Sequence, residues 1–206
     1  MRAQSFRFFL QSIRSIKVNL VVKILIASDF FIWSAMYLLS PIMALFVTER
    51  IIGADIAVVG IATSVYFVSK SIFEIPVGLL IDRTISEKDN FFMAIFGALI
   101  LSAIYFLFPL ISTIWQLYFI QGLAGFGAAC AYPGWYTLFG RHIDFQREAL
   151  EWSLHDIVIG VGMTIASVSG AFLAQRFGFD VLFLLIGIFS SIGAFTLLII
   201  RKKIII

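Results

Sequence analysis

Apolar residues occupy six long stretches of the chain, and short polar segments separate them. The stretches cover residues 24–47, 56–81, 91–111, 114–139, 152–173 and 181–200. A helix needs roughly 20 consecutive apolar residues to cross the hydrocarbon core of a bilayer. The pattern therefore predicts six membrane-spanning helices joined by short connections. Because six is an even number, both ends of such a chain lie on the same side of the membrane.

The composition supports this prediction. Hydrophobic residues make up 61% of the chain and charged residues 13%, whereas soluble domains hold roughly 45–50% and about 25%. The chain is therefore expected to be all-α, a polytopic transmembrane helical bundle. The net charge of +3 is spread between the apolar stretches, so no nucleic-acid partner is expected. The single cysteine, Cys130, excludes an internal disulfide.

Lysine and arginine are distributed unevenly between the two ends of the predicted helices. The side that holds both termini receives Arg2, Arg7, Arg14, Lys17, Lys23, Arg83, Lys88, Arg141, Arg147, Arg201, Lys202 and Lys203. The opposite side receives only Arg50 and Arg176, and Lys70 lies inside the second stretch. Basic residues favour the cytoplasmic side of short loops. We therefore expect a multi-pass protein of the plasma or inner membrane with both termini in the cytoplasm.

The residues before the first span form a separate basic segment, so we divide the chain into segment 1–23, a transmembrane domain at 24–200 and a basic tail at 201–206. In segment 1–23 apolar residues recur at helical spacing opposite the basic ones. This pattern is typical of an amphipathic helix on the anionic cytoplasmic leaflet. A disordered basic tail that only sets the topology explains it equally well. Basic residues run through the segment, which excludes a signal peptide.

The third and sixth spans carry no charged residue inside the membrane, whereas the first, second and fifth carry charged residues and the fourth carries Gln121, Tyr132, Trp135 and Tyr136. Charged groups in a bilayer face the bundle interior or a wet cavity. The first, second, fourth and fifth spans are therefore predicted to line a polar space, and the third and sixth to face lipid. This splits the chain into two triplets. Because three is odd, the second triplet runs inverted relative to the first, which is a 3+3 inverted repeat.

The polar and aromatic residues of these spans give a candidate substrate or ion site near the middle of the membrane. Its predicted members are Asp29, Trp33, Tyr37, Lys70, Glu74, Gln121, Tyr132, Trp135, Tyr136 and Asp156. Lys70 and Glu74 are one helical turn apart and can pair. They either serve the site or form a structural pair, between themselves or with Asp29 or Asp156. The Asp29 face suits a cavity wall for a polar or cationic substrate, and aromatic packing within the bundle is the alternative.

Glycines in the fourth and fifth spans are expected to let neighbouring helices approach closely. These are Gly122, Gly125, Gly127, Gly160, Gly162 and Gly170.

The end of the second span carries a short motif at Gly78, Leu80, Asp82 and Arg83. It resembles the loop 2–3 signature of the major facilitator superfamily of secondary transporters, G-x-L-a-D-R-x-G-R-K, and departs from it after Arg83. The resemblance implies a cytoplasmic gate that helps to hold two halves of a transporter together, with Gly78 packed against a neighbouring helix. The alternative is an ordinary helix end with a solvated Asp-Arg pair.

Two further segments are similar to patterns of the same family. Gln121, Gly122 and Gly127 match the pattern R-x-x-q-G-x-g-a-a of the fourth helix, with Tyr118 in the place of the arginine. Residues 177–183 resemble the "fGf…lF" turn after the fifth helix. The glycine–proline pair of drug/proton antiporters is missing, so a drug antiporter is not expected.

The resemblance implies one six-helix half of a transporter that moves a small solute by alternating access. The second six-helix half would come from the same chain, if this is a fragment, or from a homodimer or a heteromer. A non-transporting membrane receptor or an assembly subunit that reuses the fold is the alternative function. The sequence carries no enzyme signature. No cofactor and no metal are expected, and the predicted partners are the lipid bilayer, a small-molecule substrate and the second half.

Overall fold

The computed structural model describes residues 18–83 and 86–205. Most of the predicted amphipathic segment, residues 1–17, lies outside the described residues. The first helix begins at Leu20, four residues before the predicted start of the first span. The described residues of the basic tail form a short helix directly after the last span, α8 (Arg201–Ile205).

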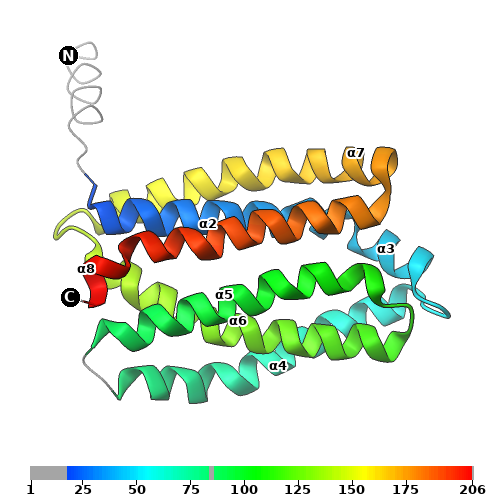
Figure 1. Ribbon diagram of the computed structural model, residues 1–206, viewed down its shortest axis with the longest axis horizontal. Coiled ribbons are helices and arrows are strands. Elements are labelled where there is room, and N and C mark those ends of the chain that lie inside the picture. Colours follow the sequence, from blue (N-terminus) through cyan, green and yellow to red (C-terminus); the bar gives the residue numbers. More distant parts are fainter. Residues whose placement is uncertain (1–17, 84–85, 206) are drawn as a thin grey trace, which may run out of the picture.

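The described part of the chain is a bundle of long helices that run back and forth (Figure 1). The first span runs from α2 through η1 into α3, over Leu20–Arg50. The elements in order are α2 (Leu20–Leu39), η1 (Ser40–Ile42), α3 (Met43–Arg50), α4 (Ile56–Asp82), α5 (Glu87–Leu107), η2 (Phe108–Leu110), α6 (Ile114–His142), α7 (Glu148–Thr196), η3 (Leu197–Ile200) and α8. The predicted all-α transmembrane bundle is confirmed.

Helix α7 accounts for two of the predicted spans. Its 49 residues would measure about 74 Å if straight, at about 1.5 Å per residue, whereas a bilayer core is about 30 Å thick. Gly178 interrupts it with a φ of 80°, in the left-handed region that favours glycine. Figure 1 shows the chain reversing there, so α7 forms two antiparallel legs. The start of α2 and the end of α8 consequently lie at the same end of the bundle.

Side chains at the helix starts explain why the helices begin where they do. Asn19 accepts a hydrogen bond from the N–H of Val21 at 3.0 Å, and Asp55 accepts one from the N–H of Val58 at 3.0 Å. Thr113 and Gln116 form a capping box at the start of α6. Each of these contacts satisfies a backbone donor that a helix start leaves without a partner.

Four segments of the described chain are long and apolar enough to cross a membrane, and α6 is not among them. These are Leu20–Arg50, Ile56–Asp82, Glu87–Leu110 and Glu148–Ile204. With 29 residues α6 is long enough, but its glycines, Gln121 and aromatic residues lower its hydropathy. Since it packs between α4 and α5, α6 needs less apolar surface than a helix that faces lipid on several sides.

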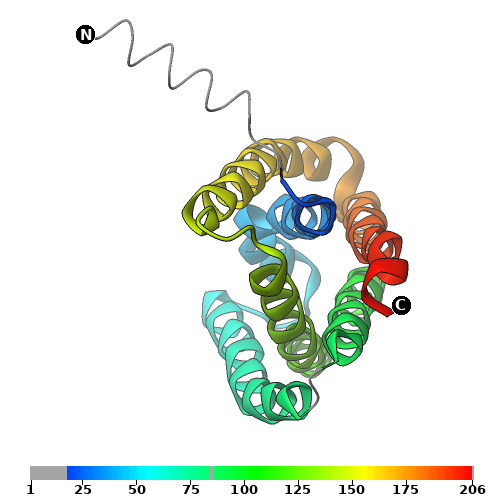
Figure 2. The same cartoon turned by 90° about the vertical axis from the view of Figure 1, so that its left-hand side faces the viewer.

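The helices form two groups, which Figure 2 shows end-on. In one group α2 packs along α7, and in the other α4 and α5 pack against α6. The groups meet where α5 contacts α7, and smaller contacts join α2 to α6 and α3 to α4. Between α5 and α7 the hydroxyl of Ser102 donates a hydrogen bond to that of Ser190 at 2.8 Å. Figure 2 shows α4 set apart from α2 across the bundle.

Candidate functional site

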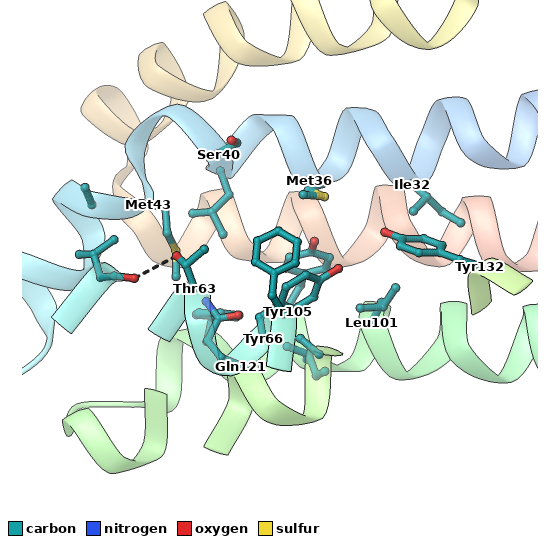
Figure 3. Close-up of a pocket in the computed structure, with 17 residues that line it drawn as sticks. Ile32, Met36, Ser40, Met43, Thr63, Tyr66, Leu101, Tyr105, Gln121 and Tyr132 are labelled. Carbon is teal, nitrogen blue, oxygen red and sulfur yellow. Dashed lines mark hydrogen bonds between the residues drawn. The ribbon is translucent and has the colours of Figure 1, made fainter. Parts of the chain in front are cut away.

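A cavity of about 380 Å³ opens between α2, α4, α5 and α6 (Figure 3). It lies toward the end of the bundle opposite the termini, since α2 contributes Ile32 to Leu39 and η1 and α3 contribute the next residues. Its apolar lining consists of Ile32, Met36, Leu39, Met43, Ala44, Val59, Phe67, Leu101, Ile104, Phe108 and Ala124. Its polar lining consists of Ser40, Thr63, Tyr66, Tyr105, Gln121 and Tyr132. All of these polar side chains are neutral.

The close contact of α4 with α6 fixes one wall of the cavity. A Cβ atom on Gly125 would collide with the backbone carbonyl of Tyr66, so only glycine allows this approach. The hydroxyl of Ser69 donates a hydrogen bond to the carbonyl of Gly122 at 2.6 Å. Small residues on α6 therefore hold Tyr66 on the cavity side of α4.

The helices that line this cavity differ from the predicted set. The third span, α5, supplies Leu101, Ile104 and Tyr105, so the prediction that it faces only lipid was wrong. The fifth span, the first leg of α7, supplies none of the lining residues. Charged residues do not mark this cavity, because Lys70 pairs with Glu74 within α4 and Asp29 pairs with His155 where α2 contacts α7.

Lys70 and several predicted aromatic residues gather beside the cavity around Tyr132. The Lys70 ammonium lies 4.9 Å from the centroid of the Tyr132 ring and 3.5 Å from a Glu74 carboxylate oxygen. Trp33 belongs to this group because its ring stacks on that of Tyr132, with the two ring centroids 6.2 Å apart and the two planes 8° apart. Tyr37 lies 6.4 Å from Trp33, ring to ring. Of the predicted site residues, Gln121 and Tyr132 line the cavity itself.

The Lys70 charge is therefore already engaged, by a carboxylate and by the face of a ring. Tyr136, 6.2 Å from Tyr132 between centroids, is 48% exposed and lies outside the lining.

Asp29 does not face the cavity but bridges α2 to α7. Its Oδ2 lies 2.9 Å from Nε2 of His155, and both side chains are buried. The other ring nitrogen of His155, Nδ1, lies 3.1 Å from Asp156, whose side chain is 77% exposed. The predicted site residues Asp29 and Asp156 thus share one partner, His155.

Aromatic rings enclose this bridge on the α6 side. The His155 ring centroid lies 5.1 Å from that of Trp135, 5.6 Å from that of Phe139 and 5.8 Å from that of Trp152. Trp135, predicted as a cavity residue, is 4% exposed and instead adjoins a void of about 20 Å³ that Asp29 also lines. His155 was not among the predicted site residues, although it joins Asp29 to α7. An ionisable side chain beside Asp156 inside an apolar stretch was the signal that could have identified it.

The remaining predicted residues divide into packed and open positions. A Cβ on Gly127, Gly162 or Gly170 would approach another helix too closely, whereas a Cβ on Gly122 would make an ordinary contact with Val65 at 3.7 Å. Nothing lies within 4 Å of a Cβ on Gly160 or Gly78. Among the described residues, no other helix packs closely against these two glycines.

In the motif at the end of α4, Leu80, Asp82 and Arg83 are all exposed. Their side chains are accessible to a further helical element, which is what a gate between two halves requires.

Comparison with known proteins assigns the bundle to one family. The sequence profile of the Major Facilitator Superfamily matches residues 25–204. The chain is 28% identical over 144 residues to the "Inner membrane transport protein YajR" of Escherichia coli strain K12, an alignment that covers 68% of this chain and 30% of YajR. It superposes on a crystal structure of the POT family transporter PepTSo with a TM-score of 0.76 and 19% identity, over 92% of this chain and 39% of PepTSo. The chain therefore spans about a third of the length of these proteins.

Proposed function

Because the chain belongs to the major facilitator superfamily, we propose that it moves a small solute across the membrane by alternating access and that the cavity is part of the solute site. The observation that carries this proposal is an open cavity of about 380 Å³ between helices long enough to span a bilayer. Its size falls within the range of ligand pockets, about 300–1,000 Å³. Transport proteins among its relatives support the general activity.

A second six-helix half completes the site in this proposal. Major facilitator transporters bind substrate between two such halves, and the cavity between α2, α4, α5 and α6 would form the share of the site that this half contributes. The second half comes from a continuation of the same chain, from a second copy or from another protein. Both ends of the chain lie in the cytoplasm, because the basic residues gather at that end of the bundle. Asp82 and Arg83 then lie at the cytoplasmic gate.

Alternating access can be tested without knowing the solute, because it exposes the cavity to each side of the membrane in turn. Thr63 lines the cavity, and Cys130 is the chain's single cysteine. A Thr63→Cys, Cys130→Ala variant is treated with a membrane-impermeant thiol reagent in right-side-out and in inverted membrane vesicles of the expressing cell. We expect the thiol to be labelled from both sides, because each conformation opens the cavity to one side.

Two exposed positions near the ends of the bundle serve as controls. Thr48→Cys, in α3, should be labelled only from the outside, and Ser153→Cys, in the first turns of α7, only from the cytoplasmic side. If the Thr63→Cys thiol reacts from one side alone while both controls behave as expected, the chain does not alternate. A receptor or an assembly subunit would give that result.

A further inference from the structure

The cavity lining differs from the rest of the membrane-embedded surface in its charge. Its described residues include no Asp, Glu, Lys, Arg or His, although the surrounding spans contain several. Resting on the proposed function, we infer that the cavity takes an uncharged aromatic molecule that carries a hydrogen-bonding group.

Burying a charge in an apolar cavity is costly. An ion that leaves water for an apolar site needs a partner of opposite charge, or it costs several kcal/mol or more. The ionisable groups on either side of Tyr132 and Trp33 already have partners: Lys70 pairs with Glu74, and Asp29 with His155. A charged solute would therefore find no free counter-ion on this half, whereas a neutral one needs none.

The lining of the cavity is rich in aromatic rings and contains two methionines. Aromatic rings come from three helices: Tyr66 and Phe67 from α4, Tyr105 from α5 and Tyr132 from α6, with Phe108 at the outer end. Figure 3 shows the tyrosines along the cavity together with Met36 and Met43. Aromatic faces favour stacked or edge-to-face contacts with another ring. Methionine side chains adapt to an irregular outline and make favourable contacts with rings. A planar aromatic ligand matches both features.

The lining also offers hydrogen-bonding groups on Thr63, Gln121 and Ser40. The Thr63 hydroxyl donates its proton to the carbonyl of Val59 at 2.9 Å, which leaves its oxygen free to accept. The Gln121 amide can both donate and accept, and so can the hydroxyl of Ser40. A ligand with a hydroxyl or amide group would satisfy these groups, whereas a pure hydrocarbon would leave them unpaired at a cost of about 1–3 kcal/mol each.

The test uses three probes of similar shape and different charge. They are 4-phenylphenol, which is neutral at pH 7, biphenyl-4-carboxylate and 4-phenylbenzylammonium. The rate of N-ethylmaleimide reaction is measured for the Thr63→Cys, Cys130→Ala variant in the same vesicles, with each probe at equal concentration. We expect the neutral probe to slow the reaction at least tenfold at a concentration where the two charged probes change it less than twofold.

A Ser40→Cys variant provides a second thiol in the lining, so that the measurement does not depend on one substitution being tolerated. Thr48→Cys, outside the lining, reports any general effect of a probe on the membrane, and its rate should not change. Equal or stronger protection by either charged probe overturns the inference, and so does the lack of protection by all three.

The two proposals fail in distinguishable ways. If the thiol is labelled from both sides but the neutral probe does not protect it, the transport proposal stands and the ligand class is wrong. If the neutral probe protects a thiol that reacts from one side only, the ligand class stands and alternating access is wrong.

Discussion

Helix α2 has two sides that are built in opposite ways. Its contact with α7, the α2–α7 seam, is closed by glycines at 162, 170 and 193 and by the buried Asp29–His155 bridge. The side toward α4 is open and lined by larger, neutral side chains such as Met36 and Leu39. One side of α2 therefore forms a close polar contact with α7, and the other side forms a wall of the uncharged cavity.

The difference shows what buried polar groups do in this bundle. In the described spans the hydrogen-bonded Asp29–His155 pair joins two helices at the seam, while the cavity lining has no ionisable Asp, Glu, Lys, Arg or His. Interhelical polar contacts in membranes stabilise association, and a neutral lining keeps the cavity from holding ions tightly. The seam should therefore be sensitive to substitution and the cavity tolerant. Four predictions test this contrast, from the largest expected effect to the smallest.

The largest effect is expected from breaking the Asp29–His155 pair at the seam. His155→Ala removes the partner of Asp29 and should lower the free energy of unfolding by about 3–5 kcal/mol, because the buried carboxyl group of Asp29 loses its hydrogen-bond partner on α7. Reversible unfolding of the detergent-purified protein in SDS measures this change.

Two controls distinguish the loss of the Asp29–His155 interaction from a general packing defect at position 155. Asp156→Asn alters the exposed partner of His155 and should cost less than about 1 kcal/mol. Asp29→Leu combined with His155→Leu removes both members and should recover much of the loss. If the double variant is as unstable as His155→Ala, the pair is not what stabilises the seam.

The second prediction concerns the close approach of α7 to α2. A Cβ on Gly170 would collide with the backbone carbonyl of Leu38, so Gly170→Ala should destabilise the protein by about 1–3 kcal/mol. Gly160→Ala, on the same helix and with nothing within 4 Å, should be neutral or stabilising by up to about 1 kcal/mol, because alanine is the better helix former. Equal melting temperatures of the two variants would contradict a tight seam.

The third prediction compares two serines on the first span. Ser28 is fully buried and donates a hydrogen bond to the carbonyl of Gly193 at 2.8 Å. Ser28→Val should cost about 1–2 kcal/mol, since the bond is lost and the larger side chain is crowded. Ser40→Val, in the cavity lining, should change stability by less than about 0.5 kcal/mol, because space is available. Thermal unfolding of the two variants side by side distinguishes them, and a reversed order would remove the contrast between seam and cavity.

The smallest effect is expected at the outer end of the bundle. Arg50 and Asp180 pair at 3.6 Å with side chains 48% and 66% exposed. Arg50→Gln should cost at most about 1 kcal/mol, because water and salt screen an exposed pair. A shift in melting temperature as large as that of Gly170→Ala would mean that this pair, rather than the seam, holds the two legs of α7 against the first span.

The fold could be predicted from the sequence because length and apolarity alone decide whether a helix can cross a bilayer. The six apolar stretches correspond to the six long helical legs of the described residues, and Gly178 in the predicted turn reverses α7. The family could be predicted because the residues from Gly78 to Arg83, at the end of the second span, match part of the family's loop 2–3 signature.

The site was harder to predict because residue type does not reveal the direction of a side chain. Asp29 and Trp33 were placed on one cavity wall, but Asp29 points to His155 and Trp33 stacks on Tyr132. Tyr66, Tyr105 and Thr63 were missed, since uncharged residues of these types are ordinary in membrane helices. Which helix neighbours which is set by glycine positions acting together, and only the packed structure reveals that.

The sharing of α2 between the seam and the cavity has a mechanical consequence. Because glycines bring α2 and α7 into close contact along the seam, we expect these two helices to move as one unit relative to α4. Helix α6 contacts both of them, since Tyr132 stacks on Trp33 and Trp135 lies against His155. A solute that fills the cavity would therefore act mainly on the distance between α2 and α4, the two cavity walls that belong to different helix groups.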